Sequence, residues 1–332
     1  MCIRDSSAKT YIKNICAKIE QTCNVTLKSY GAPMDPLYHP EIDETPFLSD
    51  EETSQYRMMI GCGLWAVTLG RFDVHFALST LSQFNIMPRE GHFRAVLRIF
   101  GYLRAYSKGK IIIDTRYTEN SNYEEIKQNW KELYPGATEQ IPDNMPVPLG
   151  KSVEISTYVD ASFANDLKNR RSVTGFIIFI NKTPIKWYTK RQNTIETSTF
   201  GAELVAARIA TEYTMEIKYK LRMLGIPLIK TGTILFGDNK SVVTNMTLPS
   251  SPLKKRHNAI AYHFIREAVA AGILRFIHIP GTLNIADVLT KPLPPNQFYK
   301  LLALILFSPM TCLLYTSPSP RDGATSRMPS SA

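Results

Sequence analysis

The sequence predicts an α/β fold in which a five-stranded sheet is flanked by helices and is preceded by a smaller, mainly helical region. From Val153 onward, apolar alternation and helical spacing follow the order three strands, helix, strand, helices, strand, helix. Before about residue 116, apolar residues recur mostly at the three-and-four spacing of helices. The 332 residues suffice for two domains with cores of their own.

The second half of the chain has clear element boundaries. Asn181 to Pro184 forms a plausible hairpin turn, Thr197 to Thr199 offers N-cap hydroxyls, and Gly225 and Gly272 are typical helix ends. The expected strands cover residues 155–162, 172–181, 184–190, 233–236 and 273–279. The expected helices run from 199 to 225, from 239 over a short stretch, from 259 to 271 and from 284 to 292.

The first half is expected to be a helical structural module. Helical spacing covers residues 56–81 and 91–106, with a turn at 85–90, and 30–50 is expected to be an extended loop. Residues 117–152 are a polar connector, with one amphipathic helix over 122–134 and then four prolines. We therefore expect a helical region at 7–116, a linker at 117–152, an α/β domain at 153–300 and an unassigned tail at 301–311.

Both ends are interpreted as sequencing-adapter scars. Residues 1–6 back-translate to a transposase adapter end, and residues 312–332 back-translate to the opposite end and its continuation. On this interpretation Met1 is not a natural start, and the reading frame is a fragment of a longer one.

Composition favours a nucleic-acid partner and argues against several other classes. The net charge of +10 and the pI near 9.3 favour a polyanion. The five cysteines form no CxxC or Cys/His cluster, which argues against zinc and a disulfide framework and suits a reducing interior. No apolar run is long enough to span a bilayer, and we expect no membrane partner.

Four acids come from separate predicted elements. Asp160 lies near a strand end and Glu203 lies one turn into the long helix, while Asp238 follows another strand and Asp287 opens the last helix. Hard oxygen ligands of this kind select Mg²⁺ or Mn²⁺. Taken singly, Asp238 could be a cap partner, Asp287 a first-turn acid and Glu203 a solvated side chain.

Several short strings occur in the order of a known family. They are Tyr158–Ala161, Arg170–Gly175, Trp187–Gln192, Thr197–Glu203, Gly237–Asn239, Lys255–His257, Tyr262–Glu267 and Ala286–Pro292. Together they resemble the ribonuclease H domain of copia-type retrotransposon Pol polyproteins. Upstream, Tyr56–Gly61, Thr68–Asp73 and Arg98–Leu103 resemble the thumb and connection segments that follow the polymerase of this family. The resemblance implies a ribonuclease H-like mixed five-stranded sheet.

The resemblance also implies a chemistry. Asp160, Glu203, Asp238 and Asp287 become the catalytic, metal-binding set, holding two Mg²⁺ ions, with Mn²⁺ as a substitute. The implied reaction is hydrolysis of the RNA strand of an RNA–DNA hybrid. The implied partners are that hybrid and the upstream polymerase portion of the polyprotein. We expect an intracellular protein of a cytoplasmic retrotransposon particle, with the nucleus as the alternative location.

Basic residues near loops are candidates for contacts with the nucleic-acid backbone. The substrate-binding candidates are Arg170, Arg171, Lys190, Arg191, Lys255, Arg256 and His257. Trp187 is expected to be a core aromatic residue, and His263 is expected to pack on its helix.

The sequence departs from the expected pattern at two points, and two alternative functions remain. The loop Pro280–Asn284 holds no histidine of the kind that cellular ribonucleases H carry there, and His278 before it is interpreted as structural. The polymerase motif Tyr-x-Asp-Asp is absent from the sequence, so DNA synthesis is not expected. One alternative is a catalytically silent nucleic-acid-binding relic. The other, a DDE-type integrase, fits the order of the acids poorly.

Overall fold

A five-stranded mixed sheet forms the centre of the protein in the computed structural model, which describes residues 4–118, 128–252 and 258–307. Its strands are β3 (Val153–Ser162), β4 (Val173–Ile180), β5 (Thr183–Arg191), β6 (Leu228–Gly237) and β7 (Arg275–His278). They lie in the order β5-β4-β3-β6-β7. The first three are antiparallel, and β6 and β7 run parallel to β3. The predicted fold class is confirmed.

The strand sequences explain why β4 lies inside the sheet. β4 reads Val-Thr-Gly-Phe-Ile-Ile-Phe-Ile, and its residues are buried up to the last one. Such continuous runs of β-branched and aromatic residues are typical of strands covered on both faces. Asn181 takes a φ of +53° in the turn to β5, as predicted for a tight hairpin.

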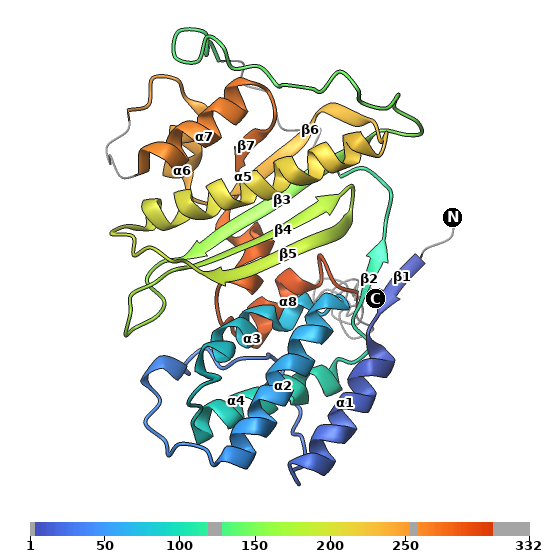
Figure 1. Cartoon of the computed structure of the whole chain (residues 1–332), viewed down its shortest axis with the longest axis vertical. Coiled ribbons are helices and arrows are strands. Elements are labelled where there is room, and N and C mark those ends of the chain that lie inside the picture. The colour runs from blue at the N-terminus through green and yellow to red at the C-terminus, as the bar shows by residue number, and fades with distance from the viewer. Residues whose placement is uncertain (1–3, 119–127, 253–257, 308–332) are drawn as a thin grey trace, which may run out of the picture.

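Three helices cover one face of the sheet (Figure 1). They are α5 (Thr199–Met223), α6 (Lys240–Thr247) and α7 (Ala259–Ala270). Ser198 caps α5 by accepting a hydrogen bond from the Gly201 amide. Ala202, Ala206 and Ala210 are buried on α5, and these small side chains let the helix lie close to β3 and β4.

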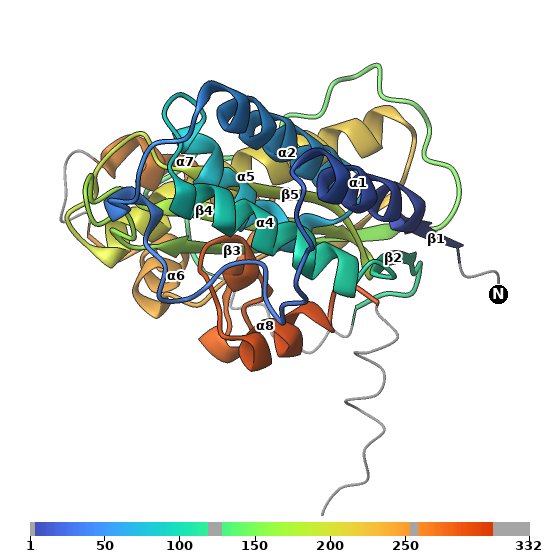
Figure 2. The ribbon, with the colours of Figure 1, turned by 90° about the horizontal axis from the view of Figure 1, so that it is seen from below.

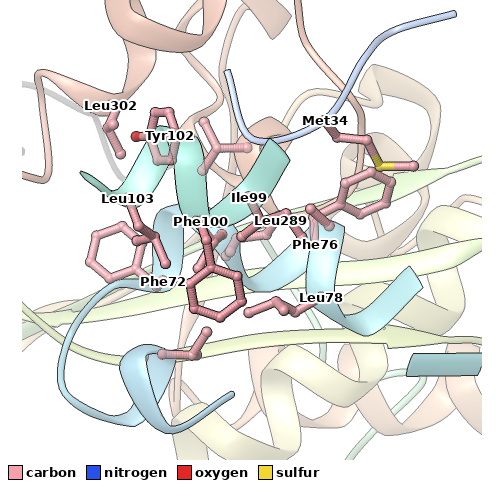
Figure 3. Close-up of a cluster of buried hydrophobic side chains, with 14 of the residues drawn as sticks. Met34, Phe72, Phe76, Leu78, Ile99, Phe100, Tyr102, Leu103, Leu289 and Leu302 are labelled. Atoms are coloured by element: carbon pink, nitrogen blue, oxygen red, sulfur yellow. The ribbon is translucent and has the colours of Figure 1, made fainter. Parts of the chain in front are cut away.

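The helical region covers the opposite face (Figures 1 and 2). It consists of α1 (Lys9–Thr22), α2 (Asp50–Thr68), α3 (His75–Leu81) and α4 (Glu90–Ala105), and α8 (Pro295–Leu302) packs beside it. Ile177 and Phe179 of β4 share one buried cluster with Phe72, Phe100 and other residues of these helices. Figure 3 shows Leu289, from the C-terminal part of the chain, among the same side chains. The helical region and the sheet therefore have a continuous core.

A short antiparallel pair joins the two ends of the helical region. β1 (Arg4–Ser7) pairs with β2 (Lys110–Ile113) through backbone hydrogen bonds. Residues 4–6 of this pair belong to the segment interpreted as an adapter scar, and that interpretation stays a prediction.

Three expected helices differ from those observed. The predicted helix over 56–81 starts earlier, at a Ser49–Glu52 capping box, and breaks after Thr68, where Gly70 takes a φ of +98°. Residues 128–134 contain a turn and no helix, and the remainder of the predicted 122–134 helix lies outside the described residues. The last predicted helix is a 3-10 segment, Ile285–Leu289, which we call η7.

Candidate metal centre

The three predicted aspartates meet at one edge of the sheet. Asp160 lies near the end of β3, and Asp238 directly follows β6. Because β3 and β6 are parallel neighbours, their carboxyl ends share this edge. Asp287 arrives on η7, and carboxylate oxygens of the three aspartates lie within 4.8 Å of one another.

Glu203 lies beside this group on α5. Its carboxylate is not among the oxygens that lie within 4.8 Å of one another in the group of three aspartates. Burial and the negative charges of Asp160 and Asp238 raise the pKa of Glu203 well above its usual range. All four predicted acids therefore contribute to one electrostatic site, with Asp160 at its centre.

Two hydrogen bonds hold η7 over the sheet. The buried Asn284 side chain donates from Nδ2 to the Val159 carbonyl oxygen at 2.9 Å, and its Oδ1 accepts from the Ala286 amide. Further along, the Thr189 hydroxyl donates to the Leu289 carbonyl oxygen at 2.9 Å. These contacts fix both ends of the segment that carries Asp287.

Gly175 makes this close approach possible. It lies opposite Asp160 in the register of β3 and β4. A Cβ atom at Gly175 would lie 2.5 Å from Cγ2 of Thr290 and 2.9 Å from Cβ of Leu289. Because Gly175 has no side chain, the residues at the end of η7 can pack directly against the backbone of β4.

The site accumulates negative charge. Burial and the charge of Asp160 raise the pKa of Asp238, and the same two causes raise the pKa of Asp287 to about 7. Two carboxylates about 5 Å apart repel by roughly 3 kcal/mol at an effective dielectric constant near 20. An all-oxygen cluster with this excess charge fits a hard divalent cation such as Mg²⁺ or Mn²⁺.

Lys291 and Thr290 also belong to the site, although the sequence reasoning did not assign them a role. Nζ of Lys291 lies 2.8 Å from Oδ1 of Asp287 and 3.2 Å from Oδ2 of Asp160. The Thr290 hydroxyl donates a hydrogen bond to Oδ2 of Asp160. Their signal was available, because both stand in the same Ala286–Pro292 string as Asp287.

The predicted substrate-binding residues are only partly brought together. Arg170 is exposed in the β3–β4 loop with a φ of +53°, and Arg171 beside it is half-buried. Lys190 is exposed near the end of β5, whereas Arg191 pairs with Asp166 of the loop at 3.1 Å. The other three candidates, Lys255, Arg256 and His257, lie outside the described residues.

The helical region also contacts this loop. The amide of Leu167 donates to Oε1 of Glu41 at 3.0 Å. Asp166 shapes the same loop by accepting from the amides of Lys168 and Asn169. The loop that presents Arg170 and Arg171 is thus held from both sides.

The histidines and Trp187 have simpler surroundings. His278 is exposed at the end of β7, with Nε2 3.1 Å from the Asp238 carbonyl oxygen. His263 is exposed on α7, where its ring lies edge-on against that of Tyr262 at 5.2 Å between centroids. Its Nδ1 lies 2.7 Å from the Tyr134 hydroxyl. Trp187 packs against Phe72 with ring centroids 5.1 Å apart, so the prediction of a core aromatic residue is confirmed.

The sheet order and the flanking helices define an α/β protein with a ribonuclease H-like fold. The chain is similar to the retrovirus-related Pol polyproteins from transposons RE1 and RE2 of Arabidopsis thaliana, with 27% and 26% identity over 292 residues. It is also 26% identical over 243 residues to the corresponding polyprotein from transposon TNT 1-94 of Nicotiana tabacum. These relatives confirm the expected resemblance to retrotransposon Pol polyproteins.

The matches cover most of this chain and a small part of the relatives. The RE1 and RE2 matches span 88% of the chain and 17% of each relative, and the TNT 1-94 match spans 73% and 16%. No protein-family model matches the chain.

Solved structures similar to the chain include two ribonucleases H1. LC11-RNase H1, isolated from compost by a metagenomic approach, is 21% identical, with 41% of this chain and 92% of that chain covered and a TM-score of 0.32. RNase H1 from Halobacterium salinarum NRC-1 is 16% identical, with 41% and 93% covered and a TM-score of 0.31. Among the described residues, none of the helices has both the length and the apolar character needed to cross a bilayer.

Proposed function

We propose that the chain is a metal-dependent endonuclease that cleaves the RNA strand of RNA–DNA hybrids during retrotransposon reverse transcription. The observation that carries the proposal is the meeting of Asp160, Asp238 and Asp287 within 4.8 Å, with Glu203 beside them. The relationship to transposon Pol polyproteins gives this site a context in which hybrids arise.

Divalent ions held by these acids would supply an activated water and stabilise the leaving oxygen of the phosphodiester. The chain's own residues supply the geometry. Asp160 near the end of β3 and Asp238 directly after β6 stand at the carboxyl ends of parallel neighbouring strands, and η7 is fixed against these strands by Asn284 and Thr189. Carboxylates held on rigid elements keep their positions when ions and substrate arrive.

The hybrid would lie along the edge that carries the acids. Arg170 and Lys190 are exposed on a loop and a strand next to this edge, where they could contact phosphates. Arg191 already pairs with Asp166, so its proposed part is to hold the loop. The upstream polymerase portion of the polyprotein is the proposed covalent partner, because the relatives are Pol polyproteins.

The test uses the full chain, a labelled RNA–DNA hybrid and Mg²⁺. We expect cleavage of the RNA strand that is abolished by EDTA and reduced by at least about 10²-fold in Glu203→Gln and Asp238→Asn. Glu216→Gln is the matched control, since Glu216 lies on α5 as well, exposed and paired with Lys220. Its activity should equal that of the unchanged chain.

Absence of RNA cleavage with Mg²⁺ and Mn²⁺ would contradict the proposal, as would cleavage unaffected by Asp238→Asn. Hybrid binding that survives EDTA without cleavage under either metal would instead favour the catalytically silent relic.

A further inference from the structure

The carboxylate cluster contains a positive charge of its own. Lys291 reaches back over η7 to two carboxylates of the cluster, those of Asp160 and Asp287. Its Nζ lies 2.8 Å from Asp287 and between 3.2 and 3.3 Å from both oxygens of Asp160. Of the basic residues that the structure describes, Lys291 is the one that forms ion pairs with these acids.

The position of Lys291 is fixed by its surroundings. Its amide donates to the Asp287 carbonyl oxygen at 3.1 Å, and Pro292 follows directly. Its side chain lines a small cavity together with Met34 and Phe76 of the helical region. The backbone bond keeps Lys291 next to Asp287, and the residue lies against the helical region.

The ammonium pairs with only some of the acids. It forms ion pairs with Asp160 and Asp287, and within the described part of the chain it forms none with Asp238, which follows β6, or with Glu203 on α5. Four carboxylates and one ammonium leave a net charge of about −3 when all are ionised. One divalent ion reduces this excess, while a second would have to share Asp160 and Asp287 with a cation already present.

We propose that Lys291 acts as a resident counter-cation, which occupies one of the two cation positions in the cluster. Without nucleic acid, the chain then binds a single divalent ion between Asp160, Asp238 and Glu203. This inference rests on the proposed metal-dependent function and changes the expected pair of ions into one ion plus an ammonium group. Lys291 is a positioning residue, since it acts on the ligands of the ion.

The test measures Mn²⁺ binding to the full chain without nucleic acid, by the electron paramagnetic resonance signal of free Mn²⁺ and by calorimetry. The unchanged chain should bind one ion. Lys291→Met should bind two ions, with the first bound at least about tenfold more tightly, because the competing charge is gone. Lys291→Arg keeps the charge and should still bind one ion, and Lys300→Met, on exposed Lys300 of α8, should match the unchanged chain.

A second measurement keeps the test independent of any loss of stability. Mn²⁺ should raise the melting temperature of Lys291→Met more than that of the unchanged chain, because its acids are less neutralised without metal. Lys291→Gln, a second neutral variant with a polar end, should behave in the same way.

Failure of the counter-cation proposal can be told apart from failure of the proposed nuclease function. Two ions bound by the unchanged chain, or equal binding by Lys291→Met, overturns the counter-cation and leaves the proposed nuclease intact. No Mn²⁺ bound by either protein removes the metal centre and with it both proposals.

Discussion

At Gly175 the absence of a side chain decides where Asp287, the acid of η7, lies. The Cβ atom that alanine would add lies 2.5 Å from Thr290 and 2.9 Å from Leu289, closer than packed atoms allow. The segment would have to move away from Asp160, and Asp287, Thr290 and Lys291 would move with it.

We therefore expect Gly175→Ala to lower hybrid cleavage by at least about tenfold and to destabilise the fold by about 1–3 kcal/mol. Denaturant unfolding and Mn²⁺ binding measure the two effects. The matched control is Gly61→Ala at exposed Gly61 of α2, where a Cβ meets nothing within 4 Å. The control should be neutral or stabilising by about 0.5–1 kcal/mol. Unchanged activity in Gly175→Ala would show that η7 tolerates displacement.

Asp287 gives the metal-free protein a pH dependence. Burial and Asp160 raise its pKa from 3.8 to about 7 in the folded state. A raised acid pKa means that the folded state holds the proton more tightly, so this contribution to stability is present below pH 4 and is lost as pH rises towards 7.

In EDTA, we expect the melting temperature of the unchanged chain to fall relative to that of Asp287→Asn between pH 4 and pH 7, because asparagine does not ionise. Thermal unfolding of both proteins across this range measures the difference. Saturating Mg²⁺ should reduce it. Parallel curves for the two proteins would contradict the charge accumulation described for the site.

At the scale of elements, the site depends on how η7 is attached to the sheet. Asn284 is fully buried, and it both caps η7 and donates to β3. The sequence predicts that the last helix starts at residue 284, because asparagine before a helical segment is a common N-cap. The bond to Val159, 125 residues earlier in the chain, has no local signal and depends on the tertiary fold.

Asn284→Ala should therefore cost about 1–3 kcal/mol of unfolding free energy, since it removes a cap and leaves a buried carbonyl without this donor. Chemical denaturation measures the loss. The control is Asn296→Ala on exposed Asn296 of α8, expected within about 0.5 kcal/mol of the unchanged chain. A loss of similar size in both variants would mean that Asn284 has no special role.

Features with a local signal could be predicted from the sequence, whereas contacts that depend on the tertiary fold could not. The strands were predictable because β-branched and aromatic runs are bounded by turn residues, as at Asn181. The acids were predictable as a set through their strings. The string also contains Lys291, but its contact with Asp160 was not predictable, because an i,i+4 lysine is usually a surface partner on a helix and only the fold brings it to Asp160.

At the scale of the whole molecule, the two regions expected as separate domains share a core. Ile177 and Phe179 on one face of β4 pack with the helical region, whereas Phe176 and Ile178 on the other face pack with α5. The continuous apolar run of β4 indicated burial on both faces, but apolar spacing alone does not show which helices cover each face.

A chain of residues 150–307 alone should therefore fail to fold into a stable monomer. It would expose Ile177, Phe179, Leu289 and Phe298, each worth about 1.5–3 kcal/mol when buried, against a typical total stability of about 5–15 kcal/mol. Size-exclusion chromatography and thermal unfolding compare it with residues 7–307. A cooperative transition in the shorter chain, equal to that of the longer one, would show that the shared core is dispensable.

The most direct measurement of the central claim is hydroxyl-radical cleavage of the full chain by Fe²⁺ bound in place of Mg²⁺. If the acids hold a divalent ion, the backbone will be cut near Asp160, Asp238 and Asp287, segments that are distant in sequence and adjacent in space. Excess Mg²⁺ and the substitution Asp160→Asn should suppress the cuts. Cuts that appear elsewhere, or that persist unchanged in Asp160→Asn, would contradict a metal centre at this edge of the sheet.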